Sequence, residues 1–147
     1  MLLHFDSQHV HLRPYGILLI FLSSVFFVSG QSATCPPEDF ECQVQLFTKQ
    51  IQKNPNDAAA YLGRGNALYY SGNNNSAVLD WTKAIELNPK NLDAYLARGT
   101  YYRTLRTQDE KALADLNKVI ELAPSNSRGY LGRGQVYGNL HNVDLSF

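Results

Sequence analysis

Apolar and polar residues alternate with a helical period over two neighbouring stretches near the middle of the chain. In residues 57–70, apolar or small residues recur at steps of one, three and four, namely Ala58, Tyr61, Leu62, Gly65 and Leu68. Residues 76–87 resume this spacing with Ala77, Val78, Trp81, Ala84 and Ile85. The pattern predicts two amphipathic helices, each with one apolar face.

Turn and cap residues predict where these helices begin and end. The run GNNN at 72–75 separates the two stretches, because Gly and Asn accept the left-handed backbone angles that end helices. Pro89 is expected to stop the second helix, since a residue before proline is pushed out of the α region. Good N-cap residues precede each predicted first helix, namely Asn56 or Asp57, Asn91, and Ser125 or Asn126.

The helical pair is repeated along the chain. Tyr61, Tyr95 and Tyr130 are separated by 34 and 35 residues, and the same spacing relates Gly65, Gly99 and Gly134. Prolines follow the same period, and one residue is inserted between Gly99 and Ala112. The units span 56–89, 90–124 and a partial 125–147, and residues 42–55 resemble the second helix of an earlier unit.

Small residues at fixed places explain how such units would stack. Gly65 and Ala77, like Gly99 and Ala112, would let helices approach closely, while bulky side chains fill the remaining space. One hairpin cannot bury its own apolar face, so its neighbours must cover the rest. The predicted fold is all-α, a short α-solenoid of antiparallel helical hairpins with two full repeats flanked by partial ones.

These residues resemble the tetratricopeptide repeat (TPR), a 34-residue helical pair. The first unit carries Tyr61, Gly65, Leu68, Ala77, Trp81, Ala84 and Pro89 at the motif positions, and departs from the motif at Leu68. The second carries Tyr95, Gly99, Tyr102, Ala112, Leu116, Val119 and Pro124, and departs at Leu116 and Val119. The third has Tyr130, Gly134 and Tyr137. The resemblance covers about residues 40–147 and is specific for the fold.

The resemblance implies a concave groove, lined by the first helices, that holds a peptide segment of another protein. The groove candidates it assigns are Asn66, Tyr69, Tyr70, Asp93, Thr100, Arg103, Arg128 and Gln135. Aromatic residues and arginine are typical binding anchors. Tyr69 and Tyr70 have an equally weighted alternative role, which is to cover the edge of the core.

Some members of the family clamp the C-terminal carboxylate of a chaperone with lysine, asparagine and arginine side chains. The matching positions here hold Leu62, Asn66, Ala97, Arg128 and Gly132. Only Asn66 matches outright, and Arg128 conserves a charge. The sequence therefore argues against a carboxylate clamp.

Each repeat also carries an arginine before its central glycine. An aspartate follows three residues after the small residue of the second helix, as Asp80 and Asp115. We expect Arg64 to pair with Asp80, and Arg98 with Asp115, across each hairpin. Arg133 has no equivalent aspartate in the sequence.

The first thirty residues differ from the rest. Residues 16–28 form an uncharged apolar run after Arg13, and Val28, Ser29 and Gly30 suit cleavage of a secretory signal peptide. We expect a signal peptide at 1–30, a linker at 31–37 and the repeat domain at 38–147. Export to an extracellular, periplasmic or lumenal compartment follows, with an uncleaved membrane anchor as the alternative. His4, His9 and His11 would be lost with the leader.

Cys35 and Cys42 lie just beyond the leader. Nearby thiols usually pair in an oxidising compartment, so a disulfide is expected. A metal site would need further ligands, and no histidine is close. Asn74 begins the sequon Asn74-Asn75-Ser76 and is a candidate glycosylation site, predicted in the turn between helices.

Charge and composition exclude several functions. The 147 residues carry 13 basic and 13 acidic side chains, which gives no basic surface for nucleic acid and no polybasic membrane patch. Only His141 remains after the leader, and no nucleophile motif is present. We expect a non-catalytic protein that needs no cofactor or metal and inserts into no membrane once the leader is cleaved.

Two alternatives to a peptide-binding adaptor stay open at this point. The partial third unit has an apolar side that could support a homodimer through residues 127–147. The chain could also be a truncated form of a longer array, since about three units are usually needed for stability.

Overall fold

A computed structural model describes residues 35–144, and the predicted leader lies outside the described residues. Within that range the chain forms six α-helices and no strand. The helices are α2 (Phe40–Lys53), α3 (Ala58–Tyr70), α4 (Asn74–Leu87), α5 (Leu92–Thr104), α6 (Asp109–Leu122) and α7 (Ser127–Asp144). The predicted all-α class is confirmed.

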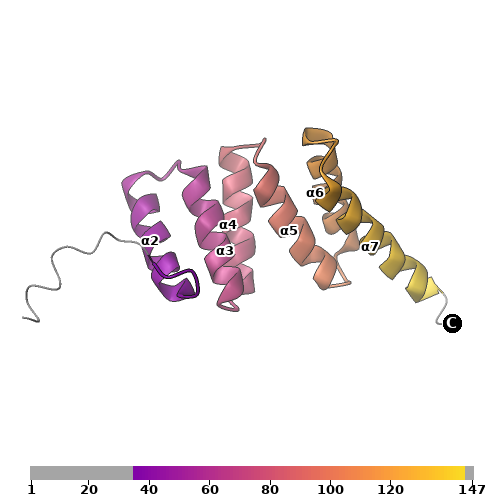
Figure 1. Ribbon diagram of the computed structural model, residues 1–147, viewed down its shortest axis with the longest axis horizontal. Coiled ribbons are helices and arrows are strands. Elements are labelled where there is room, and N and C mark those ends of the chain that lie inside the picture. The colour runs from indigo at the N-terminus through magenta and orange to yellow at the C-terminus, as the bar shows by residue number, and fades with distance from the viewer. Residues whose placement is uncertain (1–34, 145–147) are drawn as a thin grey trace, which may run out of the picture. The chain divides into compact units, whose positions relative to one another are not determined.

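The helices pack in chain order as antiparallel hairpins (Figure 1). The pairs α3–α4 and α5–α6 correspond to the two full repeats, with α2 packed on α3 and α7 packed on α6. Helix α5 also contacts α4, α7 and α3, so the first helices of successive units lie side by side. The predicted stack of hairpins is therefore present over residues 35–144.

The helix boundaries follow the cap residues in the sequence. The carboxylate of Asp57 accepts hydrogen bonds from the backbone N–H groups of Ala59 and Ala60, both at 3.0 Å. Asn91 caps α5 and Asn126 caps α7 in the same way. Each cap satisfies N–H groups that have no partner within the helix.

The turns inside the two hairpins differ by one residue. Residues 71–73 join α3 to α4, and Gly72 has the positive φ of 86° that glycine tolerates. Residues 105–108 join α5 to α6 and take up the inserted residue, and there Arg106 adopts a φ of 51°. The insertion is thus confined to a loop, and the helices keep their register.

Close contact at small residues holds each hairpin together. A Cβ placed on Gly65 would lie 2.8 Å from Trp81 Cδ1, and one on Gly99 would lie 2.9 Å from Asp115 Cβ. The large side chains Trp81 and Leu116 are fully buried beside these glycines. The glycines therefore set the distance between the paired helices.

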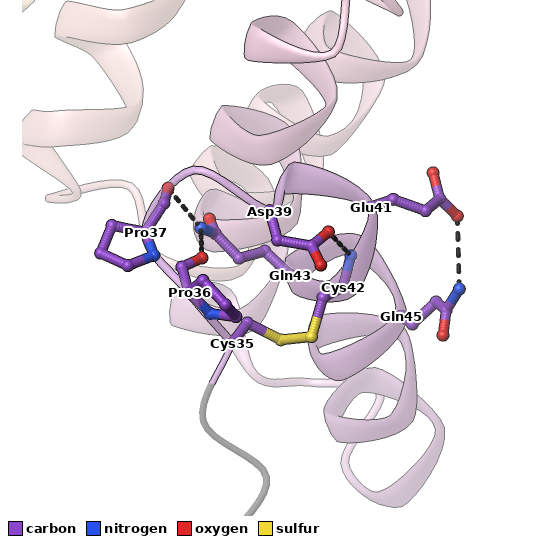
Figure 2. The surroundings of a disulfide bond; sticks show 8 residues. All are labelled: Cys35, Pro36, Pro37, Asp39, Glu41, Cys42, Gln43 and Gln45. Atoms are coloured by element: carbon purple, nitrogen blue, oxygen red, sulfur yellow. Dashed lines mark hydrogen bonds between the residues drawn. A yellow bond between two sulfur atoms is a disulfide. The ribbon is translucent and has the colours of Figure 1, made fainter.

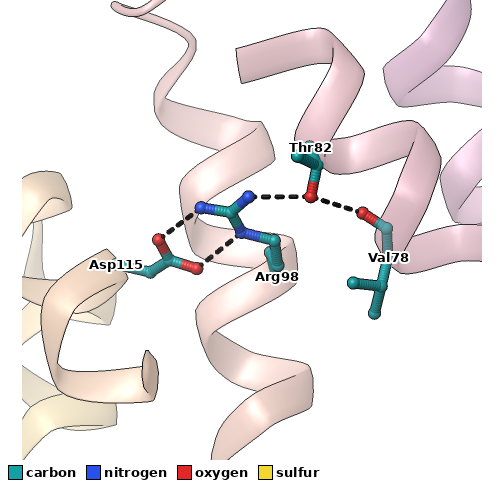
Figure 3. Close-up of polar contacts among 4 residues, drawn as sticks. All are labelled: Val78, Thr82, Arg98 and Asp115. Carbon is teal, nitrogen blue, oxygen red and sulfur yellow. Dashed lines mark hydrogen bonds and ion pairs between the residues drawn. The ribbon is translucent and has the colours of Figure 1, made fainter. Parts of the chain in front are cut away.

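Both predicted arginine–aspartate pairs are present. Nε and Nη2 of Arg64 donate to the two carboxylate oxygens of Asp80 at 2.7 and 2.8 Å. Arg98 binds Asp115 in the same bidentate way, at 2.9 Å for both bonds (Figure 3). The hydrogen bonds to Asp115 and Asp80 raise the pKa of each arginine above its ordinary value, so both guanidinium groups are charged at every physiological pH.

The same arginines also connect consecutive hairpins. Nη1 of Arg98 donates to the hydroxyl oxygen of Thr82 at 2.8 Å, and that hydroxyl donates to the carbonyl of Val78 (Figure 3). Arg64 reaches back to Thr48 on α2, at 3.4 Å. One arginine per repeat therefore joins its own hairpin to the preceding helix.

We expect Asp115→Asn to lower the free energy of unfolding by about 2 kcal/mol, because it leaves the largely buried Arg98 without its anion. A double-mutant cycle with Arg98→Met, measured by urea unfolding, should give a coupling of about 1–2 kcal/mol. Removing the exposed Lys83–Glu86 pair by Lys83→Ala should cost less than about 0.5 kcal/mol. Equal losses of stability at the Arg98–Asp115 and Lys83–Glu86 pairs would contradict this account.

The segment before α2 is fastened to its first turn (Figure 2). Cys35 and Cys42 form the expected disulfide, with a Cα–Cα distance of 5.6 Å. The Asp39 carboxylate caps α2 by accepting from the Cys42 N–H at 2.9 Å, and the Gln43 amide donates to the carbonyl oxygens of Pro36 and Pro37. The covalent link and the hydrogen bonds together define where α2 begins.

Candidate functional site

A cavity of about 330 Å³ opens on the side of the stack formed by the first helices. Residues from α3, α4, α5 and α7 line it, and its size falls at the lower end of known ligand pockets. The lining residues are Leu62, Asn66, Tyr69, Tyr70, Trp81, Asp93, Leu96, Ala97, Thr100, Tyr101 and Arg128.

Aromatic rings form one wall of this cavity. Tyr69 lies 5.8 Å from Trp81 and 6.0 Å from Tyr101, measured between ring centroids, and Trp81 lies 6.2 Å from Tyr101. Tyr70 extends the wall outward, stacked on Phe40 of α2 at 5.2 Å. Such tilted and edge-on contacts hold aromatic rings in fixed orientations. The wall offers a firm apolar surface to a ligand.

Polar groups occupy the rest of the cavity. The indole N–H of Trp81 donates to Asn66 Oδ1 at 2.9 Å, so the Asn66 amide N–H groups remain as donors toward the cavity. Asp93 in the first turn of α5 and Arg128 in the first turn of α7 contribute one negative and one positive charge. The cavity can therefore bind an apolar side chain and fix charged groups beside it.

The structure gathers most, but not all, of the groove candidates around this cavity. Six of the eight line it, namely Asn66, Tyr69, Tyr70, Asp93, Thr100 and Arg128. Among the described residues, Arg103 and Gln135 are not part of its lining. Gly132, one of the clamp positions, packs against Leu116 of α6 and does not face the cavity.

Sequence reasoning missed two aromatic residues of the wall. Trp81 lies on the predicted apolar face of its helix and is buried, yet it also lines the cavity. Tyr101 precedes the motif residue Tyr102 and lies one helical turn after Ala97, on the groove side. The spacing of Ala97 and Tyr101, four residues apart on one helix, was the signal that could have identified Tyr101.

Three further features bear on function. Asn74 is the first residue of α4 and is half-buried, so it belongs to the helix and not, as predicted, to the preceding turn. Within residues 35–141, no group of three or more His, Cys, Asp or Glu side chains is placed to hold a metal ion. The described helices include none that is long and apolar enough to cross a membrane.

Comparison with known proteins relates both sequence and fold to one family. The family model described as TPR repeat matches residues 65–104. A search among curated protein sequences gave no significant match.

Solved structures of similar fold were also found. The TPR domain of Arabidopsis OM64 is 28% identical, with a TM-score of 0.65, and the match covers 69% of this chain and 83% of that one. The TPR2B domain of yeast Sti1, in a complex with an Hsp70 peptide, is 24% identical with a TM-score of 0.61, covering 71% and 85%. The second TPR domain of human RPAP3, in complex with an HSP70 peptide, is 22% identical with a TM-score of 0.62, covering 85% and 97%.

Proposed function

We propose that the chain is a non-catalytic interaction module that binds a peptide segment of another protein, because the TPR repeat model matches residues 65–104 and a solved TPR domain has a similar fold. The binding site in this proposal is the cavity lined by α3, α4, α5 and α7. The observation that carries the proposal is the combination of a firm aromatic wall with Asn66, Asp93 and Arg128 in one hollow.

Relatives of the fold support peptide binding. The yeast Sti1 and human RPAP3 domains are bound to Hsp70 peptides. At 24% and 22% identity, these two domains share only their fold with this chain. The ligand of this chain therefore has to be inferred from the chain's own residues. Leu62 and Ala97 stand at two of the clamp positions, so we do not extend the chaperone ligand to this protein.

The chemistry of the cavity favours a particular class of peptide. An aromatic, proline or large aliphatic side chain fits against Tyr69, Trp81 and Tyr101. A carboxylate a few residues away would bind Arg128, since arginine recognises carboxylates in a bidentate way. The proposed ligand is therefore an extended segment with one bulky apolar residue near an acidic one.

We further propose that the protein acts in an oxidising compartment outside the cytoplasm. The apolar run at 16–28 supports export, and the disulfide between Cys35 and Cys42 is compatible with it. The proteins that supply the bound peptide would then be exported or exposed on a membrane surface. Alkylation mass spectrometry of the protein from its native compartment tests this, because free thiols there would contradict it.

A peptide-display selection on the immobilised chain tests the proposed groove. Binders should carry the apolar and acidic residues described above, and the variant Tyr70→Ala/Arg128→Ala should bind them about tenfold or more weakly by calorimetry. Tyr70 and Arg128 are exposed, so the fold should not change. The control variant Tyr137→Ala/Arg103→Ala changes the same residue types outside the cavity and should bind normally. Equal weakening in both variants would place the binding site elsewhere.

A further inference from the structure

Helix α7 exposes the face that its counterparts bury. Tyr130, Arg133 and Gly134 stand at the positions that Tyr61, Arg64 and Gly65 hold in α3. In α3 and α5 this face meets the second helix of the hairpin, whereas Tyr130 and Tyr137 are 45% and 48% exposed. A Cβ on Gly134 would meet nothing within 4 Å among the described residues.

The opposite face of α7 is tightly packed. Gly129 and Gly132 lie against Val119 and Leu116 of α6, and Val136 is fully buried. The helix is therefore firmly docked on α6, and its residues outside that contact, including Gln135 and Gly138, are exposed. The exposed side formed by Tyr130, Arg133, Gly134 and Tyr137 is here called the α7 face.

Arg133 is held in the orientation of the other repeat arginines. Its Nη1 donates to Asn117 Oδ1 at 3.0 Å, as Arg98 donates to Thr82. Its guanidinium lies 5.5 Å from the Tyr130 ring centroid, and Arg64 lies 5.6 Å from that of Tyr61. Nε and Nη2 of Arg133, the atoms that bind aspartate in the other repeats, have no acidic partner among the described residues.

We propose that the α7 face binds an amphipathic helix of another protein that carries the pattern small–x–x–Asp–large. The chain itself supplies the template. In α4 and α6 a small residue lies over the glycine, an aspartate three residues later binds the arginine, and a large apolar residue follows it. The bound helix would run antiparallel to α7, with its aspartate on Arg133 and its small residue on Gly134.

The described part of α7 runs past the point at which the other first helices end. By repeat register, α3 and α5 both end at the position equivalent to Asn139. Helix α7 continues five residues further, to Asp144, or about 7 Å along its axis. Up to Asp144, the described residues therefore do not turn back over the α7 face where the other hairpins turn.

Among residues 35–144, a second copy of this protein offers no suitable free helix. Its two helices with the required pattern, α4 and α6, keep Asp80 and Asp115 buried at 6% and 5% exposure. If two α7 faces paired with each other, the second copy would offer Arg133 another arginine and no carboxylate. Charge complementarity thus favours an acidic helix from a different protein.

The test uses a peptide of residues 109–122, the α6 sequence, as a defined probe for the full-length chain. A side-chain crosslink between positions 110 and 114, both exposed in α6, keeps so short a peptide helical. Fluorescence anisotropy should show saturable binding. The Asp115→Asn peptide should bind about tenfold or more weakly, and so should the Arg133→Gln chain, with no further loss when the two are combined.

Two control variants make the result specific. Gly134→Leu should abolish binding without lowering the thermal unfolding midpoint, because its side chain enters open space. The groove variant Arg128→Gln should bind the probe normally. A failure of the proposed α7 face can therefore be distinguished from a failure of the proposed groove. Absence of binding, or equal binding of the Asp115→Asn peptide, would overturn the proposal. A different outcome would be a concentration-dependent dimer in sedimentation that Gly134→Leu abolishes. In that case the α7 face binds a second copy of this protein and not a helix of another protein.

Discussion

Replacing Trp81 with alanine is expected to lower the free energy of unfolding by about 3–5 kcal/mol. The indole is 2% exposed and packs on Gly65, Tyr69 and Tyr101, so truncation leaves a cavity between α3, α4 and α5. It also removes the hydrogen bond to Asn66. Since small domains are stable by roughly 5–15 kcal/mol, this loss is a large fraction of the total.

Urea unfolding followed by far-UV circular dichroism measures this effect. The matched control is Leu79→Ala on the same helix, because Leu79 is 69% exposed and its truncation should cost less than about 0.5 kcal/mol. Trp81→Phe provides an intermediate if the alanine variant does not fold. A loss below about 1 kcal/mol for Trp81→Ala would mean that Trp81 is not part of the core.

The second large effect is a contrast between two glycines at the same repeat position. Gly65→Ala should destabilise the protein by about 1–3 kcal/mol, because the new methyl group would lie 2.8 Å from the Trp81 ring and 3.2 Å from the Ala77 carbonyl oxygen. Gly134→Ala should stabilise it by up to about 1 kcal/mol, since alanine is the better helix former and its methyl group meets open space.

Thermal unfolding of the two variants beside the unmodified chain gives this comparison directly. Both substitutions change helix propensity equally, so the difference between them reports packing alone. Destabilisation by Gly134→Ala comparable to that by Gly65→Ala would show that the α7 face is covered in the folded protein.

The repeat period made much of the fold predictable from the sequence. The spacing of Tyr61, Tyr95 and Tyr130 fixed the repeating unit, and the cap residues Asp57 and Asn91 marked where helices begin. The pairing of Arg64 with Asp80 was also predictable, because two copies of one unit place equivalent side chains in equivalent contacts.

The detail of the site was less predictable, because it depends on how neighbouring units approach one another. Trp81 belongs to a second helix, and only the three-dimensional packing brings it to a cavity lined mainly by first helices. Arg103 lies near the C-terminal end of α5, and motif positions alone could not show that it falls outside the cavity lining. Sequence periodicity gives the face of a helix, whereas the limits of a cavity depend on tertiary distances.

The described part of the chain therefore presents two different surfaces. The groove offers aromatic rings with mixed charges and suits an extended peptide, and the α7 face offers a preset arginine beside open glycine and tyrosines. The two proposals concern different ligands and can fail independently. Together they describe an adaptor that holds one partner in its groove and a second on its last helix.

The resonance of the Trp81 indole N–H tests the central claim most directly. Trp81 is the only tryptophan of the chain, so a proton–nitrogen NMR spectrum contains a single indole signal, and that signal comes from the wall of the groove. Titration with a display-selected peptide should shift this signal in proportion to binding, while the probe for the α7 face should leave it unchanged. A peptide that binds the chain without moving the Trp81 signal would contradict the proposal that the groove is the binding site.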